Sequence, residues 1–321
     1  MKVLITPRMQ NWREVSEEQL AGMAEAGATE VVVTVDRAIE LEAIRDADVL
    51  IGVIDPELLE YAGRLRWVQA LSSGVDVMMF PEFIESDIIL TSEKGTVGPH
   101  LADHAFALLL ALTRSIATSL QLKSWTVGDR IMMRTKNVEL SGLTLGVIGL
   151  GGTGTSVAVR AHGFGMRVLA IDAEDVERPM FVEEVRKPDW LPEMAAQCRV
   201  LVVCCPYTAA THHMVDSAVL NAMQPGSYVV NVTRGGIIQE DDLIAALNAG
   251  QIAGAGLDVT EEEPLPPEHP FWSMDNVVIT PHIAGASQYR EGRVFQRVLN
   301  NLRHLAAGEP LEGVIDKRKG Y

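Results

Sequence analysis

The sequence contains few cysteines, and they form no pattern that would hold a metal or a disulfide framework. Among its 321 residues only Cys198, Cys204 and Cys205 are cysteines, an odd number without CxxC spacing. We therefore predict no zinc knuckle and no metal among the functional residues, and we expect a reducing, cytoplasmic setting. We also expect no signal peptide, because the apolar run at the N terminus is too short and charged sequence follows it.

Basic residues are scarce relative to acidic ones. The chain has 27 lysines and arginines against 43 aspartates and glutamates, so its formal net charge is -16. A field of this sign repels polyanions, which predicts no binding to nucleic acid or to acidic membranes, and an anionic ligand would need a local positive site. Long hydrophobic runs are scarce too. Asp103, His104 and Arg114 interrupt the most apolar stretch, residues 101–120, which predicts a buried helix there.

Short apolar segments rich in β-branched residues recur along the chain, and each is typical of a buried strand. Segments of helical periodicity lie between many of them, as in residues 240–250. Parallel strands need crossover helices that cover both faces of a sheet, which explains why these strands are apolar throughout. We predict an α/β fold with two doubly wound domains. The strand segments are 3–6, 31–35, 49–54, 67–71, 88–91, 145–149, 168–171, 200–205, 228–233, 277–280 and one that ends at Val259.

Two helical segments divide the chain into domains. The first, from His100 to about Leu120, separates the first five strands from a second series. The other, from Ser287 to about Ala307, carries apolar residues at helical spacing, and we expect it to pack on the first domain. We find no internal repeat and no low-complexity linker. The predicted domains are residues 1–99 with 288–321, and residues 100–287.

A GxGxxG motif follows one predicted strand and precedes a predicted helix. In such a turn Gly149 permits the tight bend, Gly151 lets the backbone approach a pyrophosphate, and Gly154 allows close packing of helix on strand. The next strand ends in Asp172, 18 residues after Gly154, where a carboxylate can bind a ribose hydroxyl. Outside this context a glycine-rich turn without a ligand explains the motif equally well. Within it, the arrangement predicts dinucleotide binding.

Further acidic residues follow the ribose-binding position. Asp172, Glu174 and Asp175 place three acidic groups within four positions, and no arginine is adjacent to them in the sequence. Because these groups would repel a 2′-phosphate, we expect NAD to be preferred to NADP. The alternative for Asp172 is a solvated acid at a strand end.

Three separated residues suit one reaction. Arg234 and His282 each follow a predicted strand, at the edge where open α/β sheets bind ligands, and Glu263 lies just beyond Val259. An arginine can hold a carboxylate and polarise a carbonyl, a histidine can exchange a proton near neutral pH, and a glutamate can keep it protonated. Alone, each has a simpler explanation: a surface charge, a core histidine or a solvated acid. Together they predict hydride transfer coupled to proton transfer.

Several ordered motifs resemble those of the D-isomer-specific 2-hydroxyacid dehydrogenases, over almost the whole chain. They are Cys-Pro-Tyr-Thr at 205–208, Val-Asn-Val-Thr-Arg-Gly-Gly at 230–236, Ala-Gly-Leu-Asp-Val at 255–259 and Thr-Pro-His-Ile-Ala-Gly at 280–285. The resemblance implies that Arg234, Glu263 and His282 are the catalytic residues. It also implies that the backbone amides of Ser73 and Gly74, together with Arg234, bind the substrate.

The same resemblance implies an architecture and a cofactor site. One domain would be a Rossmann-type NAD-binding domain, and the other a flavodoxin-like substrate domain made from both ends of the chain. A homodimer would form through the long helix around residues 100–120. Asp258 would meet the carboxamide of the nicotinamide. The implied cofactor-binding residues are Gly149, Gly151, Gly152, Thr153, Gly154, Asp172, Pro206, Thr233, Asp258 and Gly285.

The implied activity is NAD-dependent hydride transfer at C2 of a small 2-hydroxy or 2-oxo carboxylate. Alternatives are an NADH-binding corepressor-like assembly protein, a formate- or phosphite-type dehydrogenase, and a phosphoglycerate dehydrogenase. The sequence has no basic localisation run, which disfavours the first, and it ends at Tyr321 without room for a regulatory domain, which disfavours the last. The sequence does not identify the substrate, because it departs from the family's usual residues at Gly152, Thr153, Thr260 and residues 92–95.

Overall fold

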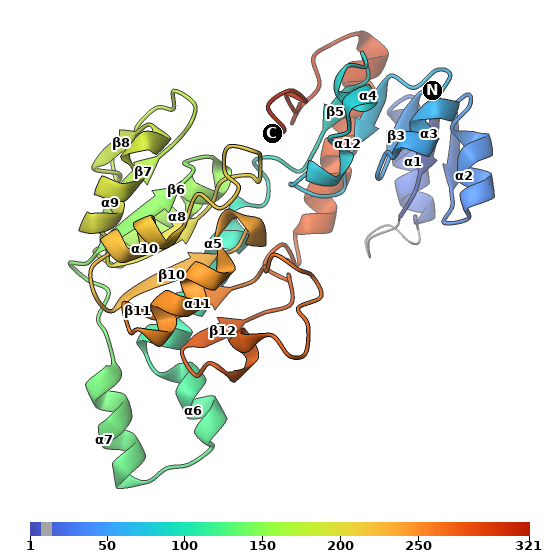
Figure 1. Cartoon of the computed structure of the whole chain (residues 1–321). Coiled ribbons are helices and arrows are strands. Elements are labelled where there is room, and N and C mark those ends of the chain that lie inside the picture. Colours follow the sequence, from blue (N-terminus) through green and yellow to red (C-terminus); the bar gives the residue numbers. More distant parts are fainter. Residues whose placement is uncertain (8–14) are drawn as a thin grey trace. The chain divides into compact units, whose positions relative to one another are not determined.

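The computed structural model describes residues 1–7 and 15–321, and the chain forms two units. One unit comprises Met1–Val97 and Ser287–Tyr321, and the other comprises Gly98–Ala286. Each unit contains its own parallel sheet (Figure 1). The division falls within two residues of the boundaries expected from the sequence.

The first unit has a five-stranded sheet in the order β2-β1-β3-β4-β5, with every pair parallel. This is the flavodoxin-like order, which confirms the predicted fold of this part of the chain. The strands are β1 (Lys2–Ile5), β2 (Glu30–Val33), β3 (Val49–Ile51), β4 (Trp67–Gln69) and β5 (Ile89–Thr91). The helices are α1 (Glu17–Glu25), α2 (Arg37–Ala43), α3 (Pro56–Tyr61), α4 (Pro81–Ile84) and α12 (Arg290–Ala307).

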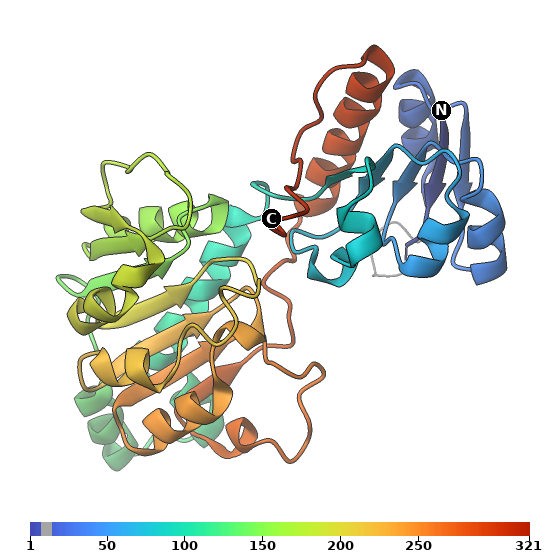
Figure 2. The ribbon, with the colours of Figure 1, turned by 45° about the horizontal axis from the view of Figure 1, so that its top comes forward.

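The last helix of the chain, α12, completes the core of the first unit. Its Val298 and Leu302 side chains are fully buried, in the same apolar cluster as Val3 and Ile5 of β1. Figure 2 shows this red helix alongside the blue strands of the same unit. Burial of one such side chain contributes about 1.5–3 kcal/mol, so α12 holds the C-terminal segment firmly on the N-terminal sheet.

The second unit has a seven-stranded parallel sheet in the order β12-β11-β10-β9-β6-β7-β8. The strand order reverses between β6 and β9, which is the Rossmann arrangement predicted from the sequence. The strands are β6 (Thr144–Ile148), β7 (Arg167–Ile171), β8 (Glu184–Arg186), β9 (Val200–Val203), β10 (Ser227–Asn231), β11 (Ile252–Leu257) and β12 (Val277–Ile279). The helices are α5 (Gly98–Thr113), α6 (Ile116–Leu122), α7 (Val127–Lys136), α8 (Gly152–Gly163), α9 (Leu191–Gln197), α10 (Ser217–Ala222) and α11 (Glu240–Asn248).

Helix α5 packs closely on the sheet of the second unit. A Cβ atom added at Gly256 of β11 would lie only 2.7 Å from Cβ of Leu108, so the helix approaches the strand where a side chain is missing. Leu101, Ala105 and Leu109 of α5 are buried. The apolar composition of this helix, for which the resemblance suggested a dimer contact, is therefore explained by packing within the unit.

The single helix expected over residues 100–120 is corrected, because the segment forms two helices. Helix α6 is bent by 64° from α5. Ser115 lies at the break with φ of 55°, in the left-handed region that ends a right-handed helix, and its hydroxyl donates to Asn137 Oδ1 at 2.7 Å. Among the described residues no single helix is long and apolar enough to span a membrane, and only this bent pair passes when its two helices are taken together.

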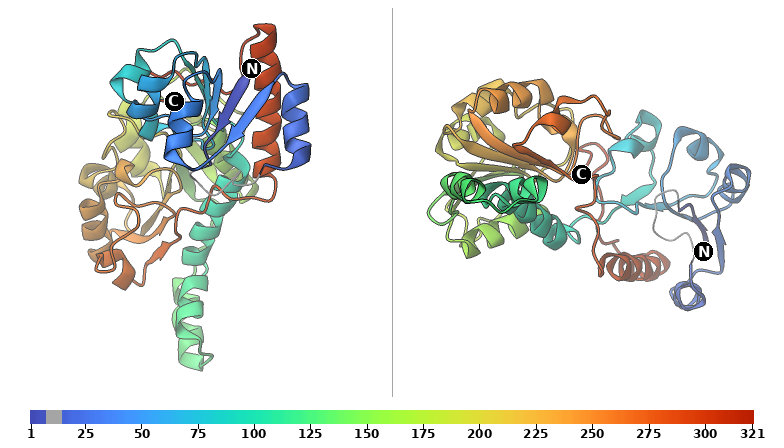
Figure 3. Two further views of the ribbon diagram at one scale, coloured as in Figure 1. Left: turned by 90° about the vertical axis from the view of Figure 1, so that its right-hand side faces the viewer. Right: turned by 90° about the horizontal axis from the view of Figure 1, so that it is seen from below.

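Helices α6 and α7 form a hairpin that projects from the second unit (Figures 1 and 3). The sequence did not predict α7. The hairpin exposes large apolar side chains, including Leu120, Trp125 and Val127, of which Trp125 is 94% exposed. Helix α7 buries none of its own residues. The hairpin therefore presents apolar surface that the rest of its unit leaves uncovered.

Candidate active site

The glycine-rich turn connects β6 to α8. Gly149 has φ of 89°, and a Cβ atom there would lie 2.8 Å from Cα of Cys205. A Cβ atom at Gly154 would lie 1.9 Å from the carbonyl oxygen of Gly149, so neither position accepts a side chain. At Gly151 no described heavy atom lies within 4 Å of such a Cβ, so space stays open beside the backbone at the start of α8. This geometry fits a bound pyrophosphate.

Asp172 follows β7 and connects it to the glycine turn. Its Oδ2 accepts a hydrogen bond from the amide of Leu150 at 2.7 Å, and its Oδ1 accepts one from the amide of Glu174 at 2.8 Å. The carboxylate is thereby held beside the turn, at the carboxyl end of the strand.

Basic residues lie closer to Asp172 than the sequence indicated. Asp172 donates its amide to the carbonyl of Arg186 on β8, and Lys187 contacts the carbonyl of Ala173 at 3.0 Å and Asp175 at 2.6 Å. The backbone of Arg186 is therefore a neighbour of Asp172, and its guanidinium pairs with Glu184. The pairing of β7 with β8 brings the backbone of Arg186 beside Asp172. The sequence analysis did not find β8, because this strand is polar and lacks an apolar pattern.

Arg234 lies in a short loop after β10 whose shape is determined by buried Asn231. The Asn231 side chain donates to the carbonyl of Arg234 at 2.8 Å and accepts from the amide of Thr233 at 3.1 Å. A Cβ atom at Gly235 would lie 1.9 Å from the carbonyl carbon of Thr260, so the loop is pressed against the segment that follows β11. The contacts around Asn231 and Gly235 thus hold the Arg234 backbone in place.

Glu263 and His282 form a direct pair. Oε2 of Glu263 lies 2.7 Å from Nδ1 of His282, and both side chains are partly exposed, by 38% and 45%. The hydrogen bond to Glu263 raises the pKa of His282, and it outweighs burial and the charge of Arg234, which lower it. Burial raises the pKa of Glu263, but the hydrogen bond and charge of His282 outweigh burial, and the net shift is downward. The charged pair is therefore favoured.

Asp258 organises the loop that carries His282. It is 1% exposed, and its carboxylate accepts hydrogen bonds from Thr280 Oγ1 at 2.6 Å and from the amides of Ile283 and Ala284 at 2.9 and 2.8 Å. His104 of α5 lies 3.3 Å from the same carboxylate. Burial opposes ionisation of Asp258, but the hydrogen bonds from His104, Thr280 and the amides outweigh it and lower its pKa.

The loop that contains Ser73 and Gly74 belongs to the first unit. The Ser72 hydroxyl donates to the carbonyl of Gly74 at 2.7 Å, and the carbonyl of Ser72 accepts from the amide of Glu93 at 3.1 Å. Arg290 of α12 donates to the carbonyl of Leu71 at 3.0 Å and pairs with the buried Glu93 at 2.8 and 2.9 Å. The Arg290–Glu93 ion pair therefore holds this loop, because the two residues also donate hydrogen bonds to the carbonyls of Leu71 and Ser72.

The residues expected to bind a cofactor follow the carboxyl ends of strands in one sheet. Pro206, Thr233 and Gly285 come after β9, β10 and β12, as Gly149 comes after β6 and Asp258 after β11. Gly152 and Thr153 begin α8. Parallel strands bring all these segments to one edge of the sheet, where doubly wound proteins bind their ligands.

Comparison with known proteins identifies the family to which this chain belongs. Residues 106–284 match the family described as D-isomer specific 2-hydroxyacid dehydrogenase, NAD binding domain. The chain belongs to this family. It is accordingly an oxidoreductase of 2-hydroxy acids with a nicotinamide cofactor.

Individual relatives of this dehydrogenase share most of its length. A glyoxylate reductase of Korarchaeum cryptofilum is 36% identical over 279 residues, which cover 84% of this chain and 82% of the relative. The structure of a D-isomer specific 2-hydroxyacid dehydrogenase family protein from Aeromonas salmonicida is 29% identical, with a TM-score of 0.81 over 98% of this chain and 99% of that one. An NADPH-dependent glyoxylate/hydroxypyruvate reductase from Sinorhizobium meliloti, solved with NADP and sulfate, is 25% identical, with a TM-score of 0.83 over 100% and 99%.

Several positioning residues of the dehydrogenase were missed by the sequence analysis. Asn231 carried a weak signal, since it stands in a motif that the resemblance used, but nothing indicated its hydrogen bonds. His104, Glu93 and Arg290 carried no signal, because each meets its partner from a distant part of the chain.

Proposed function

We propose that this dehydrogenase reduces a small 2-oxo acid, with Arg234, Glu263 and His282 as its catalytic residues. The observation that carries the proposal is the Glu263–His282 pair at 2.7 Å, on the same sheet edge as the glycine turn and close enough to Arg234 for its charge to act on both groups. A charged acid–base pair beside a dinucleotide turn suits the reduction of a carbonyl.

The roles follow from the atoms that each residue leaves available. When bound, the nicotinamide cofactor supplies the hydride for reduction. His282 uses Nδ1 for Glu263, so its Nε2 is the nitrogen that would donate a proton to the carbonyl oxygen. Glu263 keeps the imidazole protonated, and in the oxidative direction neutral His282 would accept the proton.

Arg234 would bind the substrate through its planar guanidinium. Such a group can hold a carboxylate by two hydrogen bonds and polarise a neighbouring carbonyl without losing its charge. We also propose that the backbone amides of Ser73 and Gly74 can bind a carboxylate. This local positive site explains how a chain with a net charge of -16 can bind an acid.

We propose that the chain prefers NAD to NADP. Support comes from Asp172, Glu174 and Asp175, whose charges surround the end of β7, while Lys187 is already paired with Asp175 and Arg186 with Glu184. A 2′-phosphate placed there would meet a carboxylate and a cation that is already neutralised. The test compares kcat/KM for NADH and NADPH with one 2-oxo acid. We expect NADH to be favoured at least about tenfold, which corresponds to about 1.4 kcal/mol, whereas equal values would contradict the preference.

We also propose a cytoplasmic homodimer that covers the hairpin of α6 and α7. The exposed Leu120, Trp125 and Val127 support this, because apolar surface of this kind is typical of an interface. The three cysteines are buried and free, as expected in a reducing compartment. Light scattering should give the mass of two chains for the wild type and of one chain for a variant with W125E and V127E. A wild-type monomer would contradict the proposal.

The decisive experiment measures NADH oxidation with a panel of 2-oxo acids: glyoxylate, hydroxypyruvate, pyruvate, phenylpyruvate and branched-chain oxo acids. Turnover of one or more is expected, and the trend with side-chain size would report the size of the pocket. If NADH binds and no 2-oxo acid is reduced, the proposal is wrong. Formate, phosphite and phosphorylated acids would then be tried, followed by NADH-dependent assembly with partner peptides.

A further inference from the structure

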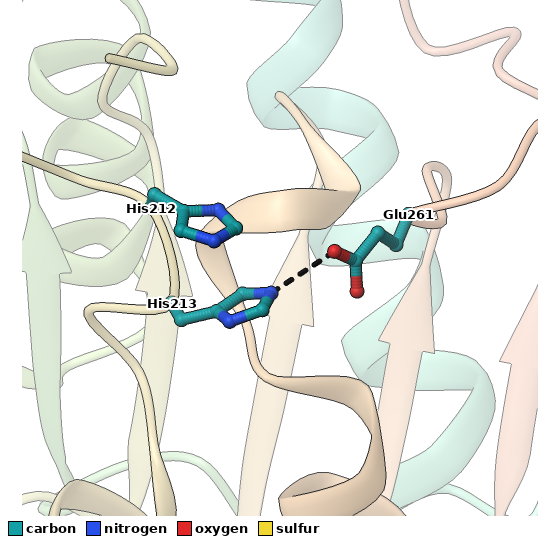
Figure 4. A group of neighbouring side chains, drawn as sticks. All are labelled: His212, His213 and Glu261. Atoms are coloured by element: carbon teal, nitrogen blue, oxygen red, sulfur yellow. Dashed lines mark hydrogen bonds and ion pairs between the residues drawn. The ribbon is translucent and has the colours of Figure 1, made fainter. Parts of the chain in front are cut away.

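Three side chains that the proposed chemistry does not use lie together in the second unit. His212 and His213 belong to the turn after β9, and Glu261 belongs to the loop after β11 (Figure 4). Nε2 of His213 lies 3.0 Å from Oε1 of Glu261, and the two imidazole rings are stacked with their centroids 3.7 Å apart. One possible ligand atom from each residue lies within 4.8 Å of the other two. We call these three residues the His-His-Glu cluster.

The backbone holds the His-His-Glu cluster in place. His213 has φ of 51°, and its amide donates to the carbonyl of Gly236 at 2.9 Å. The amide of Glu261 donates to Oε1 of Glu240 at 2.7 Å. The cluster thus connects the segments that follow β9, β10 and β11. Gly236 is two residues from Arg234 and Glu261 is two residues from Glu263, so the cluster flanks the proposed catalytic residues along the chain.

The donor set and its exposure suit a metal ion. Two imidazole nitrogens and one carboxylate oxygen are ligands of Zn²⁺, which takes a water molecule as the fourth ligand when only three side chains bind it. Ligand atoms in a tetrahedral zinc site lie about 3.3 Å apart, which is close to the 3.0 Å between His213 and Glu261. The His213 side chain is 28% exposed and that of Glu261 is 45% exposed, so a solvated ion can reach both.

His212 is the adaptable member of the cluster. Its side chain is exposed, and its Nδ1 bonds to the hydroxyl of Tyr207 at 3.0 Å. Stacked rings do not direct both nitrogens at one ion, so His212 must turn out of the stack to complete the site. Exposed side chains change rotamer within nanoseconds, which makes this adjustment easy.

We propose that His212, His213 and Glu261 bind one divalent transition-metal ion, with Zn²⁺ as the best fit. This goes beyond the proposed function, and it departs from the sequence-based expectation of no metal, because the three ligands come from two segments whose proximity is created by the sheet. The bound ion would clamp the turn after β9 to the loop after β11. Since the ion binds the folded chain, it would also raise the unfolding temperature.

The test is calorimetric titration of the untagged full-length chain with Zn²⁺. Wild type should bind one ion, and E261Q and H213N should each bind it at least about tenfold more weakly, since even the loss of an outer-shell partner costs that much. Gln keeps the size of Glu261, and Asn tolerates the left-handed backbone at His213. The matched control is H162Q, which removes an exposed histidine of α8 and should leave the affinity unchanged.

Two further measurements keep the result independent of turnover. H282Q should retain the ion, which separates the cluster from the Glu263–His282 pair. Zn²⁺ should raise the unfolding temperature of wild type and H162Q but not of E261Q or H213N. Three results would each overturn the proposal: wild type does not bind Zn²⁺, E261Q and H213N bind it as tightly as wild type, or H282Q is the only variant that loses binding. These outcomes do not depend on whether the chain reduces 2-oxo acids.

Discussion

Replacement of Glu263 by glutamine should shift the pH dependence of reduction toward lower pH. Glutamine can still accept a hydrogen bond from His282, but it carries no negative charge to favour the imidazolium. The present contact is 2.7 Å long, and the side chains of Glu263 and His282 are 38% and 45% exposed, so solvent weakens the interaction. An ion pair of this exposure contributes about 1 kcal/mol, which corresponds to about 0.7 of a pKa unit.

The sign of the shift follows from the protonation state that reduction requires. His282 must be protonated to donate, and its raised pKa extends activity toward alkaline pH. Loss of the Glu263 charge lowers this pKa, so the alkaline limb of kcat/KM should move down by about 0.7 of a pH unit. The assay is NADH oxidation over a pH series with one 2-oxo acid.

A neighbouring acid provides the control for this experiment. Glu262 is exposed and adjacent in the sequence, so E262Q removes the same charge without touching His282, and its alkaline limb should coincide with that of wild type. The reasoning would be refuted if the alkaline limb of E263Q stayed in place or moved to higher pH, because the charge of Glu263 would then not be what raises the pKa of His282.

Further predictions concern binding, folding and direction. R234A should lower kcat/KM by at least about a hundredfold, since loss of one donor to the developing charge costs about 3–4 kcal/mol, and a value near wild type would remove Arg234 from the mechanism. G154A should unfold at a lower temperature and bind NADH poorly, because its Cβ would lie 1.9 Å from the carbonyl oxygen of Gly149. G163A should behave as wild type, because no described atom lies within 4 Å of its Cβ. R290M should destabilise the chain by about 3–5 kcal/mol, since Glu93 would stay buried without its partner, and an unchanged denaturation midpoint would contradict this. The pH optimum of reduction should lie below that of oxidation, because His282 donates a proton in one direction and accepts it in the other, and coincident optima would argue against that role.

The strands that the sequence analysis identified carry an apolar run, and the missed strand does not. β9 is buried along its whole length and β2 is partly exposed, but each contains the run of β-branched residues that the pattern detects. β8 reads Glu-Val-Arg and lies at the edge of its sheet, where solvent accepts polar side chains. Its position depends on pairing with β7, which no local pattern reports.

The break in the long apolar helix was missed for a different reason. Ser115 ends α5 in a left-handed conformation and bonds to Asn137, which lies beyond α7 in the sequence. Serine has no strong preference for that conformation, so the residue type at position 115 does not predict a break in the helix. Its conformation depends on a contact that exists only after the chain folds.

The amino-acid sequence by itself determined the class of this protein, because local rules act on contiguous residues. Strand and helix periodicity, the glycine turn and the residues that follow each strand are all local, and parallel strands bring such residues to one edge. The tertiary structure alone decided which side chains meet: His104 with Asp258, Arg290 with Glu93, and His213 with Glu261. These contacts join distant segments, and their distances depend on packing that no single segment encodes.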